Sequence, residues 1–299
     1  MATTPQGGPG IPGCPAPDAH PRPGRFAMPA NACDTHMHVF GAAADYPFVA
    51  DRSYTPPEAP LEQYEALADV IGFNRFVIIQ PSIYGTDNRC TLDAVRDTRL
   101  DARAIVVVDD DVTSGELERM HEAGARGIRI NLLFRGGVQF AAAERLADQL
   151  GAMGWHVQVL IDVSRMADVT RRLGDLRLPV VFDHMGHLAT GNGLDDPGFV
   201  AMRDLVADGR AWVKLSGAYR LTAEQTPPYG DVAPFARALV EANAERCLWA
   251  TDWPHPAVAV PMPNDGALID MLADWVPDEA VRNRILVDNP ARLYGFGTH

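Results

Sequence analysis

Two short motifs at opposite ends of the chain constrain its fold more than any other feature. Residues 34–38 read Asp-Thr-His-Met-His, and residues 251–255 read Thr-Asp-Trp-Pro-His. Each follows an apolar, strand-like run, and His36 and His38 are two positions apart, so their imidazoles are expected to point to one face. Asp252 can meet them only if the chain closes on itself. The motifs therefore predict a closed barrel with a polar site at one mouth, and favour an enzyme.

The pattern along the rest of the chain agrees with a barrel. Strands are predicted at residues 32–39, 75–80, 104–108, 127–131, 156–161, 179–183, 211–215 and 246–250. Helices are predicted between and after them, at residues 61–71, 90–100, 114–123, 141–153, 165–173, 197–207, 232–243, 265–275, 277–286 and 289–294. Continuous apolar strands alternating with helices are typical of a parallel sheet buried on both faces. Eight such units favour an α/β fold of the single-domain (β/α)8 TIM-barrel type over an open doubly wound sheet.

Composition narrows the class of partner. The chain has 299 residues and a formal net charge of -13, which argues against a nucleic-acid surface. No apolar run approaches the ~18 residues of a membrane helix. Four scattered cysteines with no CxxC pair indicate free thiols and a cytoplasmic location. Residues 1–30, rich in Pro, Gly and Ala, are expected to form a flexible tail or strap, and residues 31–296 the barrel domain. The sequence is also compatible with a homo-oligomer.

Polar and ionisable side chains recur where the predicted strands end, which is where a TIM barrel places its chemistry. These positions include His36, His38, Gln80, Ser82, Arg129, Asn131, Arg135, Asp183, His184, Lys214, Arg220, Asp252 and His255. An ionisable group inside a barrel is costly to desolvate unless it is paired, ligated or used in chemistry. Their recurrence at one end of several strands therefore predicts a functional site.

The residue types indicate what this site does. His36, His38 and His184 are candidates either for metal ligands or for neutral groups that polarise a carbonyl. Asp252 is a candidate general base or metal ligand, and His255 a candidate to orient it.

A second set of residues is expected to bind the substrate. An arginine presents a fork of donors that matches a carboxylate and keeps its charge, so three arginines near one mouth predict a small anionic substrate. The candidates are Arg129, Arg135 and Arg220, with Tyr54, Gln80 and Ser82 as further donors to substrate oxygens.

The order of the motifs resembles a known family. Asp-Thr-His-Met-His, Gln-Pro-Ser, Gly-Ile-Arg-Ile-Asn, Phe-Asp-His-Met-Gly, Trp-Val-Lys-Leu-Ser-Gly and Thr-Asp-Trp-Pro-His-Pro follow one another along the chain. This order is similar to that of the amidohydrolase superfamily, in the branch that contains 2-pyrone-4,6-dicarboxylate lactonases. The resemblance covers about residues 31–296 and implies a distorted (β/α)8 barrel.

The resemblance also implies residue roles. The catalytic centre would comprise His36, His38, His184 and Asp252, with His255 just after the acid. Substrate carboxylates would be held by Arg129, Arg135, Arg220 and Tyr54. His187 departs from the pattern, because those lactonases have an arginine there, and Leu160 departs because they have a tyrosine. The resemblance thus implies a substrate with one fewer anionic group, or a different one.

The expected activity is hydrolysis of the ester bond of a small carboxylated lactone. A metal-dependent decarboxylase of a small aromatic or unsaturated acid is one alternative, and a non-catalytic barrel that binds an anionic metabolite is another. A binuclear metal centre is not expected, because Arg129, Asn131 and residues 158–161 replace the ligands of binuclear relatives. Either no metal is essential, or a single divalent ion, zinc first, is held by His36, His38, His184 and Asp252.

Overall fold

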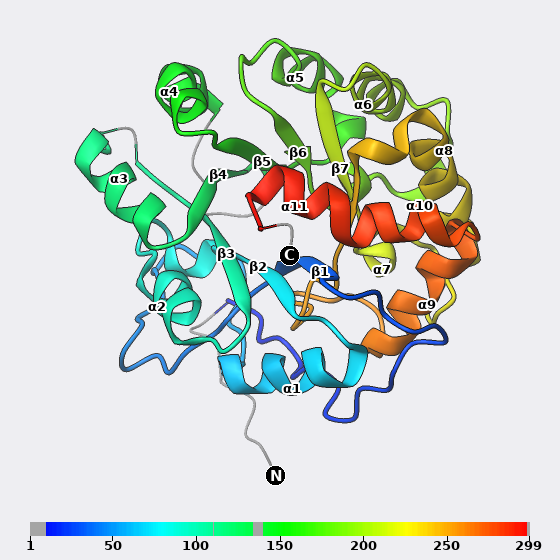
Figure 1. Cartoon of the computed structure of the whole chain (residues 1–299), viewed down its shortest axis with the longest axis horizontal. Coiled ribbons are helices and arrows are strands. Elements are labelled where there is room, and N and C mark those ends of the chain that lie inside the picture. Colours follow the sequence, from blue (N-terminus) through cyan, green and yellow to red (C-terminus); the bar gives the residue numbers. More distant parts are fainter. Residues whose placement is uncertain (1–9, 110, 134–139, 298–299) are drawn as a thin grey trace.

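Eight parallel strands form one sheet in the order β1 to β8 in the computed structural model, which describes residues 10–109, 111–133 and 140–297. The strands are β1 (Cys33–Met37), β2 (Arg75–Ile79), β3 (Asp101–Val106), β4 (Ala125–Asn131), β5 (His156–Leu160), β6 (Val180–Phe182), β7 (Ala211–Leu215) and β8 (Cys247–Trp249). Helices surround the strands on the outside (Figure 1). The predicted (β/α)8 barrel is confirmed.

The helices also follow the sequence pattern closely. They are α1 (Leu61–Ile71), α2 (Arg89–Asp97), α3 (Ser114–Glu122), α4 (Phe140–Ala152), α5 (Ala167–Leu173), α6 (Pro197–Ala207), α7 (Ala218–Leu221), α8 (Ala233–Asn243), α9 (Asp265–Trp275), α10 (Glu279–Asn283) and α11 (Asn289–Tyr294). The predicted helix 277–286 is instead α10 followed by a π-helical turn, Arg284–Asp288. Helix α7 was not predicted, because four residues are too few to show a period.

Local signals explain where several helices begin and end. Helix α3 starts at a capping box, in which the Thr113 hydroxyl accepts from the Glu116 amide and the Glu116 carboxylate accepts from the Thr113 amide. Asp196 caps α6, whose first residue is Pro197. Helix α1 ends at Gly72, whose φ of 100° places it in the left-handed region where glycine is favoured.

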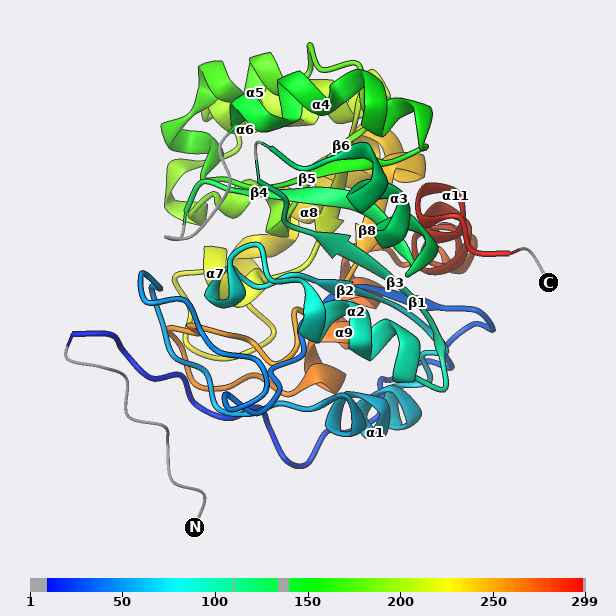
Figure 2. The same ribbon diagram turned by 90° about the vertical axis from the view of Figure 1, so that its left-hand side faces the viewer.

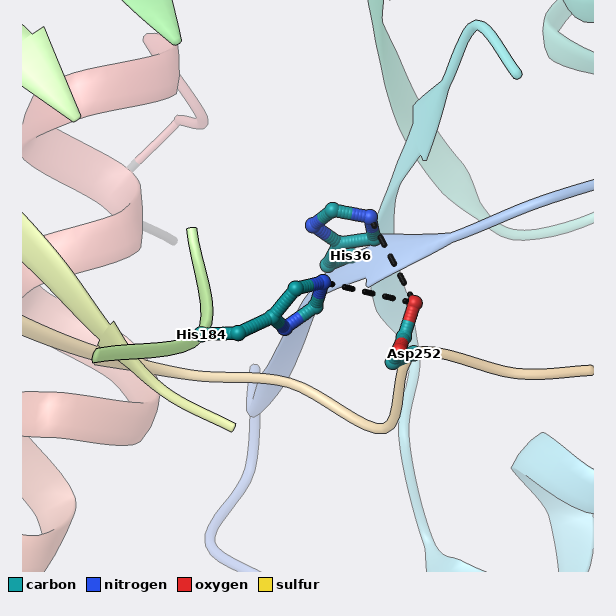
Figure 3. A group of neighbouring side chains, drawn as sticks. All are labelled: His36, His184 and Asp252. Atoms are coloured by element: carbon teal, nitrogen blue, oxygen red, sulfur yellow. Dashed lines mark ion pairs between the residues drawn. The ribbon is translucent and has the colours of Figure 1, made fainter. Parts of the chain in front are cut away.

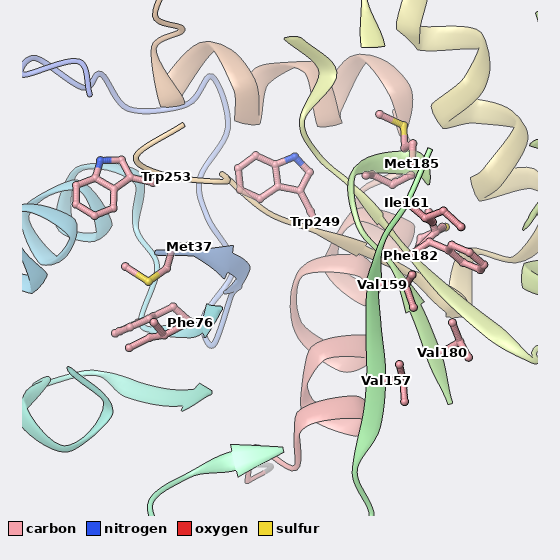
Figure 4. Close-up of a cluster of buried hydrophobic side chains, with 14 of the residues drawn as sticks. Met37, Phe76, Val157, Val159, Ile161, Val180, Phe182, Met185, Trp249 and Trp253 are labelled. Atoms are coloured by element: carbon pink, nitrogen blue, oxygen red, sulfur yellow. The ribbon is translucent and has the colours of Figure 1, made fainter. Parts of the chain in front are cut away.

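Apolar side chains pack in two separate cores, one outside and one inside the barrel. In the outer core, alternate strand residues such as Val157, Val159, Val180 and Phe182 point towards the helices (Figure 4). The inner core fills the lower part of the lumen with side chains from six strands. Tyr294 and Phe296, at the end of the described chain, cover that end of the barrel.

The upper part of the lumen is polar instead. Alternation along β5 and β7 places Gln158 and Lys214 inside the barrel, and both are fully buried. Figure 2 shows α11 at one end of the barrel, and α7 with the N-terminal segment at the other. The polar groups therefore lie towards the end where the strands finish, which is the functional end of this fold.

The first and last strands meet through the residues that follow β8. The Asp252 amide donates to the His36 carbonyl oxygen at 2.8 Å, and the His38 amide donates to the Trp253 carbonyl oxygen at 2.8 Å. The register of β1 shifts between Asp34 and Met37, which is typical of a bulge. Here the chain closes on itself, and closure brings the two motifs together.

The buried Asp34 carboxylate stabilises this junction through hydrogen bonds. It accepts hydrogen bonds from the Thr251 amide at 3.0 Å and hydroxyl at 2.5 Å, from the His36 amide at 3.1 Å and from the Tyr64 hydroxyl at 3.0 Å. Four donors compensate the loss of water around the charge. Burial nevertheless raises the pKa of Asp34 to about 6.

The described part of the N-terminal segment runs along the barrel. The Cys14 amide donates to the Thr55 carbonyl oxygen at 2.9 Å, and the Ala257 amide donates to Cys14 Sγ at 3.2 Å. Further along, the Arg22 guanidinium and the Arg25 amide both bind the Asp270 carboxylate on α9, at 2.7 and 2.6 Å. All four cysteines are free and buried. Within the described residues, no helix has both the length and the apolar character needed to cross a membrane.

The junction gives a first prediction. Thr251→Val removes a donor to buried Asp34 and an acceptor for the Trp253 amide. We expect the free energy of unfolding to fall by ~1–3 kcal/mol, the cost of leaving buried polar groups unpaired. Urea denaturation measures the change. Thr170→Val is the matched control, because Thr170 is equally buried but donates only to the Met166 carbonyl of its own helix. An equal loss in both variants would contradict a special role for the junction.

Candidate active site

One carboxylate oxygen of Asp252 lies among three imidazole nitrogens. Asp252 Oδ1 is 3.6 Å from His36 Nε2, 3.6 Å from His38 Nε2 and 3.5 Å from His184 Nε2. The imidazoles of His36, on β1, and of His38, just after it, approach each other to 3.3 Å between their Nε2 atoms. Figure 3 shows His36, on β1, and His184, in the loop after β6, pointing at the carboxylate. The structure thus brings together all four residues predicted for the catalytic centre, and all are buried.

The other nitrogen of each ring indicates which nitrogen carries the proton. His38 Nδ1 lies 2.8 Å from the Ile79 carbonyl oxygen, which can only accept, so this nitrogen must be the donor. His36 Nδ1 lies 3.1 Å from the Asp183 carboxylate, and the same argument applies. The Nε2 atoms of both rings therefore present lone pairs to Asp252. His184 Nδ1 lies 2.9 Å from the Ser216 hydroxyl, which can donate or accept.

Several lone pairs that face one point call for a positive charge or for hydrogen-bond donors between them. Asp252 Oδ1 is buried and has no hydrogen-bond donor among the described residues. The ligand atoms of His36, His184 and Asp252 lie within 4.8 Å of one another. Two nitrogens and a carboxylate oxygen at this spacing suit a divalent ion. These residues therefore fit a single metal, and they equally fit a water molecule that donates to Asp252.

The second oxygen of Asp252 is anchored. Asp252 Oδ2 accepts from the Tyr219 hydroxyl at 2.5 Å and from Arg220 Nε at 2.7 Å. Tyr219 in turn lies 3.1 Å from His255 Nδ1, and His255 Nε2 lies 3.1 Å from the Asp265 carboxylate. The His255 side chain thus reaches the Asp252 carboxylate through Tyr219, while the His255 amide donates to the Asp252 carbonyl oxygen at 2.8 Å. With Oδ2 held by two donors, Oδ1 is the oxygen left for chemistry.

Charges around the site keep the carboxylate ionised and the imidazoles neutral. Burial alone would raise the pKa of Asp252, but the adjacent Arg220 guanidinium holds it well below its usual range. Burial lowers the pKa of His36 to about 3 and that of His184 well below its usual value. At neutral pH the centre therefore contains an ionised carboxylate among neutral imidazoles. These are the forms required of a base and of metal ligands.

The loops that carry this centre have a strained backbone. Asp252 has φ of 65° and His255 has φ of 59°, and His184 and His187 have φ of 48° and 53°. Non-glycine residues rarely occupy this left-handed region, and such strain concentrates at functional sites. Gly217 also lies in this left-handed region, with a φ of 63°. A glycine is required there for a second reason, because a Cβ atom would lie 2.9 Å from the His184 side chain.

A small cavity of about 20 Å³ lies beside the centre. Its walls are formed by His38, Tyr54, Ser82, Arg129, Leu160, His184, His187, Arg220, Asp252 and Pro256. The cavity therefore collects most of the residues predicted to bind substrate, together with the two positions that depart from the lactonase pattern.

Two predicted residues, Gln80 and His255, do not line this cavity. The Gln80 amide donates to the Gly85 and Asp87 carbonyl oxygens and accepts from the Thr91 hydroxyl, so it holds the loop after β2. His255 lies behind Tyr219, as described above. Arg135 falls outside the described residues.

The two arginines of the cavity are already paired. Arg220 binds Asp252, and it also donates to the Pro256 carbonyl oxygen at 2.9 Å. Arg129 donates to the Gln80 carbonyl oxygen at 3.2 Å and pairs with Asp183 at 3.3 Å. Their guanidinium groups nevertheless border the cavity, so each arginine both positions a site carboxylate and leaves a positively charged wall.

Sequence reasoning assigned no role to several residues that support the centre. Asp183, Gln158 and Lys214 contact one another beneath His36, and Tyr219 anchors Asp252. A charged or amide side chain in the middle of a predicted buried strand was the available signal, because such a group must find partners inside the barrel. Tyr219 gave no comparable signal.

Comparison with known proteins places the chain among relatives. The amidohydrolase family model matches residues 33–296. A 4-sulfomuconolactone hydrolase from Hydrogenophaga intermedia is 40% identical over 95% of this chain and 95% of its own length. A 2-pyrone-4,6-dicarboxylate hydrolase from Comamonas testosteroni is 36% identical over 92% of this chain and 94% of its own. An apo crystal structure from Agrobacterium tumefaciens, 33% identical, superposes with a TM-score of 0.84 and covers 92% of this chain and 100% of that one.

The buried histidines predict how stability depends on pH. Burial lowers the pKa values of His36, His156 and His187 to about 3, whereas an unfolded histidine titrates near ~6.5. Unfolding therefore takes up protons throughout this window, so the free energy of unfolding falls as pH drops from about 6.5 towards 3, by ~1.4 kcal/mol per pH unit for each histidine. Asp34, with its raised pKa, opposes this trend with a single proton between about 4 and 6.

His156→Leu tests this dependence away from the active centre. The ring of His156 packs against Tyr294 at the covered end of the barrel. We expect the variant to lose about one proton from the pH slope of unfolding, measured by urea denaturation between pH 4 and 7. The exposed His20→Gln serves as control. A slope unchanged in His156→Leu would show that this histidine is not neutral in the folded protein.

Proposed function

We infer that this chain, which belongs to the amidohydrolase family, is an enzyme that hydrolyses the ring ester of a small carboxylated lactone. Two relatives that match it over nearly their whole length are named as hydrolases of 4-sulfomuconolactone and of 2-pyrone-4,6-dicarboxylate, both of them anionic cyclic esters. The observation that carries the proposal is the position of Asp252 Oδ1, an ionised oxygen beside three imidazoles at the wall of a cavity.

Asp252 is proposed as the general base. A water molecule that donates to Oδ1 would lose its proton to Asp252 as its oxygen attacks the lactone carbonyl. Tyr219 and Arg220 hold Oδ2, so the carboxylate cannot turn away during this step. The proton held at Asp252 then becomes available to the leaving oxygen when the ring opens. A positioned base of this kind contributes roughly 10²–10⁴-fold to the rate.

The histidines are proposed to stabilise the carbonyl oxygen as negative charge develops on it. A divalent ion at His36, His38, His184 and Asp252 would supply Lewis-acid polarisation and water activation there. Zinc is the proposed metal, because it favours nitrogen and carboxylate ligands in a four-coordinate arrangement. Without a metal, the imidazoles would serve only as hydrogen-bonding groups, and His184 is the one whose proton the structure leaves unassigned.

The substrate carboxylate is proposed to lie against Arg129 and Arg220, with Tyr54 and Ser82 beside it. Arg135 is proposed to join them. His187 and Leu160 form a wall without a fixed positive charge, because burial lowers the pKa of His187 to about 3. That wall favours a neutral or weakly polar part of the substrate.

Asp252→Asn tests the base. We expect kcat to fall by at least ~10²-fold, while the fold survives, since an asparagine amide directed at the Nε2 lone pairs of His36 and His38 gains hydrogen bonds there. Proton release from carboxylated lactones measures turnover, and urea denaturation measures stability. Asp270→Asn is the matched control, because Asp270 is a buried carboxylate far from the cavity, bound to Arg22 and Arg25. Full activity in Asp252→Asn would remove Asp252 as the base.

The same assay separates the alternatives. A decarboxylase would release carbon dioxide rather than open a lactone, and a chelator would abolish its activity. A non-catalytic barrel would bind the anion without forming product, and Asp252→Asn would leave its affinity nearly unchanged.

Zinc titration tests the metal. Equilibrium dialysis is expected to show one zinc ion per chain, and His184→Gln is expected to weaken binding strongly by removing a ligand. His187→Gln is the control, since His187 lines the same cavity but lies outside the ligand cluster. Equal binding by wild type and His184→Gln would place the zinc elsewhere.

A further inference from the structure

A layer of charged and amide groups crosses the barrel directly beneath the histidine cluster. Its hub is Asp183, which follows β6 and has no exposed surface. One oxygen, Oδ1, lies 3.1 Å from His36 Nδ1 and 3.4 Å from Lys214 Nζ. The other, Oδ2, accepts from Gln158 Nε2 at 3.1 Å and from Arg129 Nη2 at 3.3 Å. Side chains from β1, β4, β5 and β7 thus converge on one carboxylate.

The hydrogen bonds of this layer leave little freedom. Lys214 Nζ has three protons: one goes to the Thr35 carbonyl oxygen at 2.8 Å and one to Gln158 Oε1 at 2.7 Å. The second bond orients the Gln158 amide, because its oxygen must face the ammonium and its nitrogen must then face Asp183. The third proton points towards Asp183 Oδ1 and His36 Nδ1, which lies 3.3 Å from Nζ.

The proton on His36 follows from the charge of its neighbours. Lys214 Nζ, Arg129 Nη2 and Gln158 Nε2 are all donors and lie on the two oxygens of Asp183, so this carboxylate acts as an acceptor. His36 Nδ1 is closer to this carboxylate, at 3.1 Å, than to the ammonium. A proton on Nδ1 satisfies the carboxylate, whereas a bare Nδ1 would set its lone pair against a negative charge.

We propose that Asp183 is a positioning residue that fixes His36 in the Nδ1–H tautomer, with Gln158 and Lys214 holding Asp183 in register. This role rests on the proposed function, because its result is a His36 Nε2 atom that carries no proton and faces Asp252. The opposite tautomer would place a proton on Nε2, 3.6 Å from the Oδ1 base and 3.3 Å from His38 Nε2. That proton would occupy the base and prevent His36 from binding a metal.

This positioning role explains why a layer of charged groups, which are costly to desolvate, lies inside the barrel. Lumen layers of this fold are usually apolar, and the lower part of this lumen is. The layer centred on Asp183 lies at the level of His36. Partners that orient a catalytic or metal-binding histidine typically contribute 10–100-fold to activity or metal affinity.

Nitrogen NMR of the resting protein tests the proposal without reference to turnover. Long-range 1H–15N spectra distinguish the two tautomers, and His36→Gln identifies the His36 signals among those of nine histidines. We expect the Nδ1–H form in the wild type. In Asp183→Asn the amide can donate to Nδ1, so the Nε2–H form should become populated, and kcat should fall ~10–100-fold with a much smaller change in KM.

Asp270→Asn again provides the matched control, expected to change neither the tautomer nor kcat. An Nε2–H form of His36 in the wild type overturns the proposal, whether or not Asp183→Asn folds. A folded Asp183→Asn that keeps both the Nδ1–H form and the wild-type kcat also overturns it. If no lactone is hydrolysed but the tautomer still changes on Asp183→Asn, the positioning role stands and the proposed function fails.

Discussion

The hydrogen bonds that join β1 to the segment after β8 are the interaction on which the rest of the structure depends. Two backbone bonds, between Asp252 and His36 and between His38 and Trp253, close the barrel at its functional mouth. The same bonds bring Asp252 to the imidazoles, so closure of the sheet also assembles the centre. Asp34 secures this junction from the helix side, through Thr251 and Tyr64.

The centre works with buried charge that the barrel has to balance. Asp252 and Asp183 are buried carboxylates, and each is paired with an arginine of the cavity wall. Burying such groups costs several kcal/mol per ion unless geometry and hydrogen bonds are excellent. The arginines therefore both stabilise the carboxylates and border the cavity. A residue that pairs with a site carboxylate and borders the cavity cannot be classified as structural or functional alone.

Much of this arrangement could be read from the sequence. Alternation along a strand was enough to place His36 and His38 on one face, and the eight βα units were enough to bring Asp252 to them. The individual side-chain contacts could not be predicted from the sequence. Gln80 follows β2 as a substrate-binding residue would, yet nearby loop carbonyls take up its amide. Arg220 was expected to face substrate, and only three-dimensional packing shows that it also binds Asp252. The bulge in β1 and the short α7 leave no periodic trace, for they are set by tertiary contacts.

The union of the first strand with the last has a consequence for biosynthesis. During synthesis the N-terminus leaves the ribosome first. His36 and His38 therefore emerge long before Asp252, which completes the centre. Until the segment around Trp253 has left the exit tunnel, the nascent polypeptide has an open sheet edge along β1 and no reactive carboxylate. Truncated translation products would be catalytically inert, and their exposed edge would make them natural clients for chaperones.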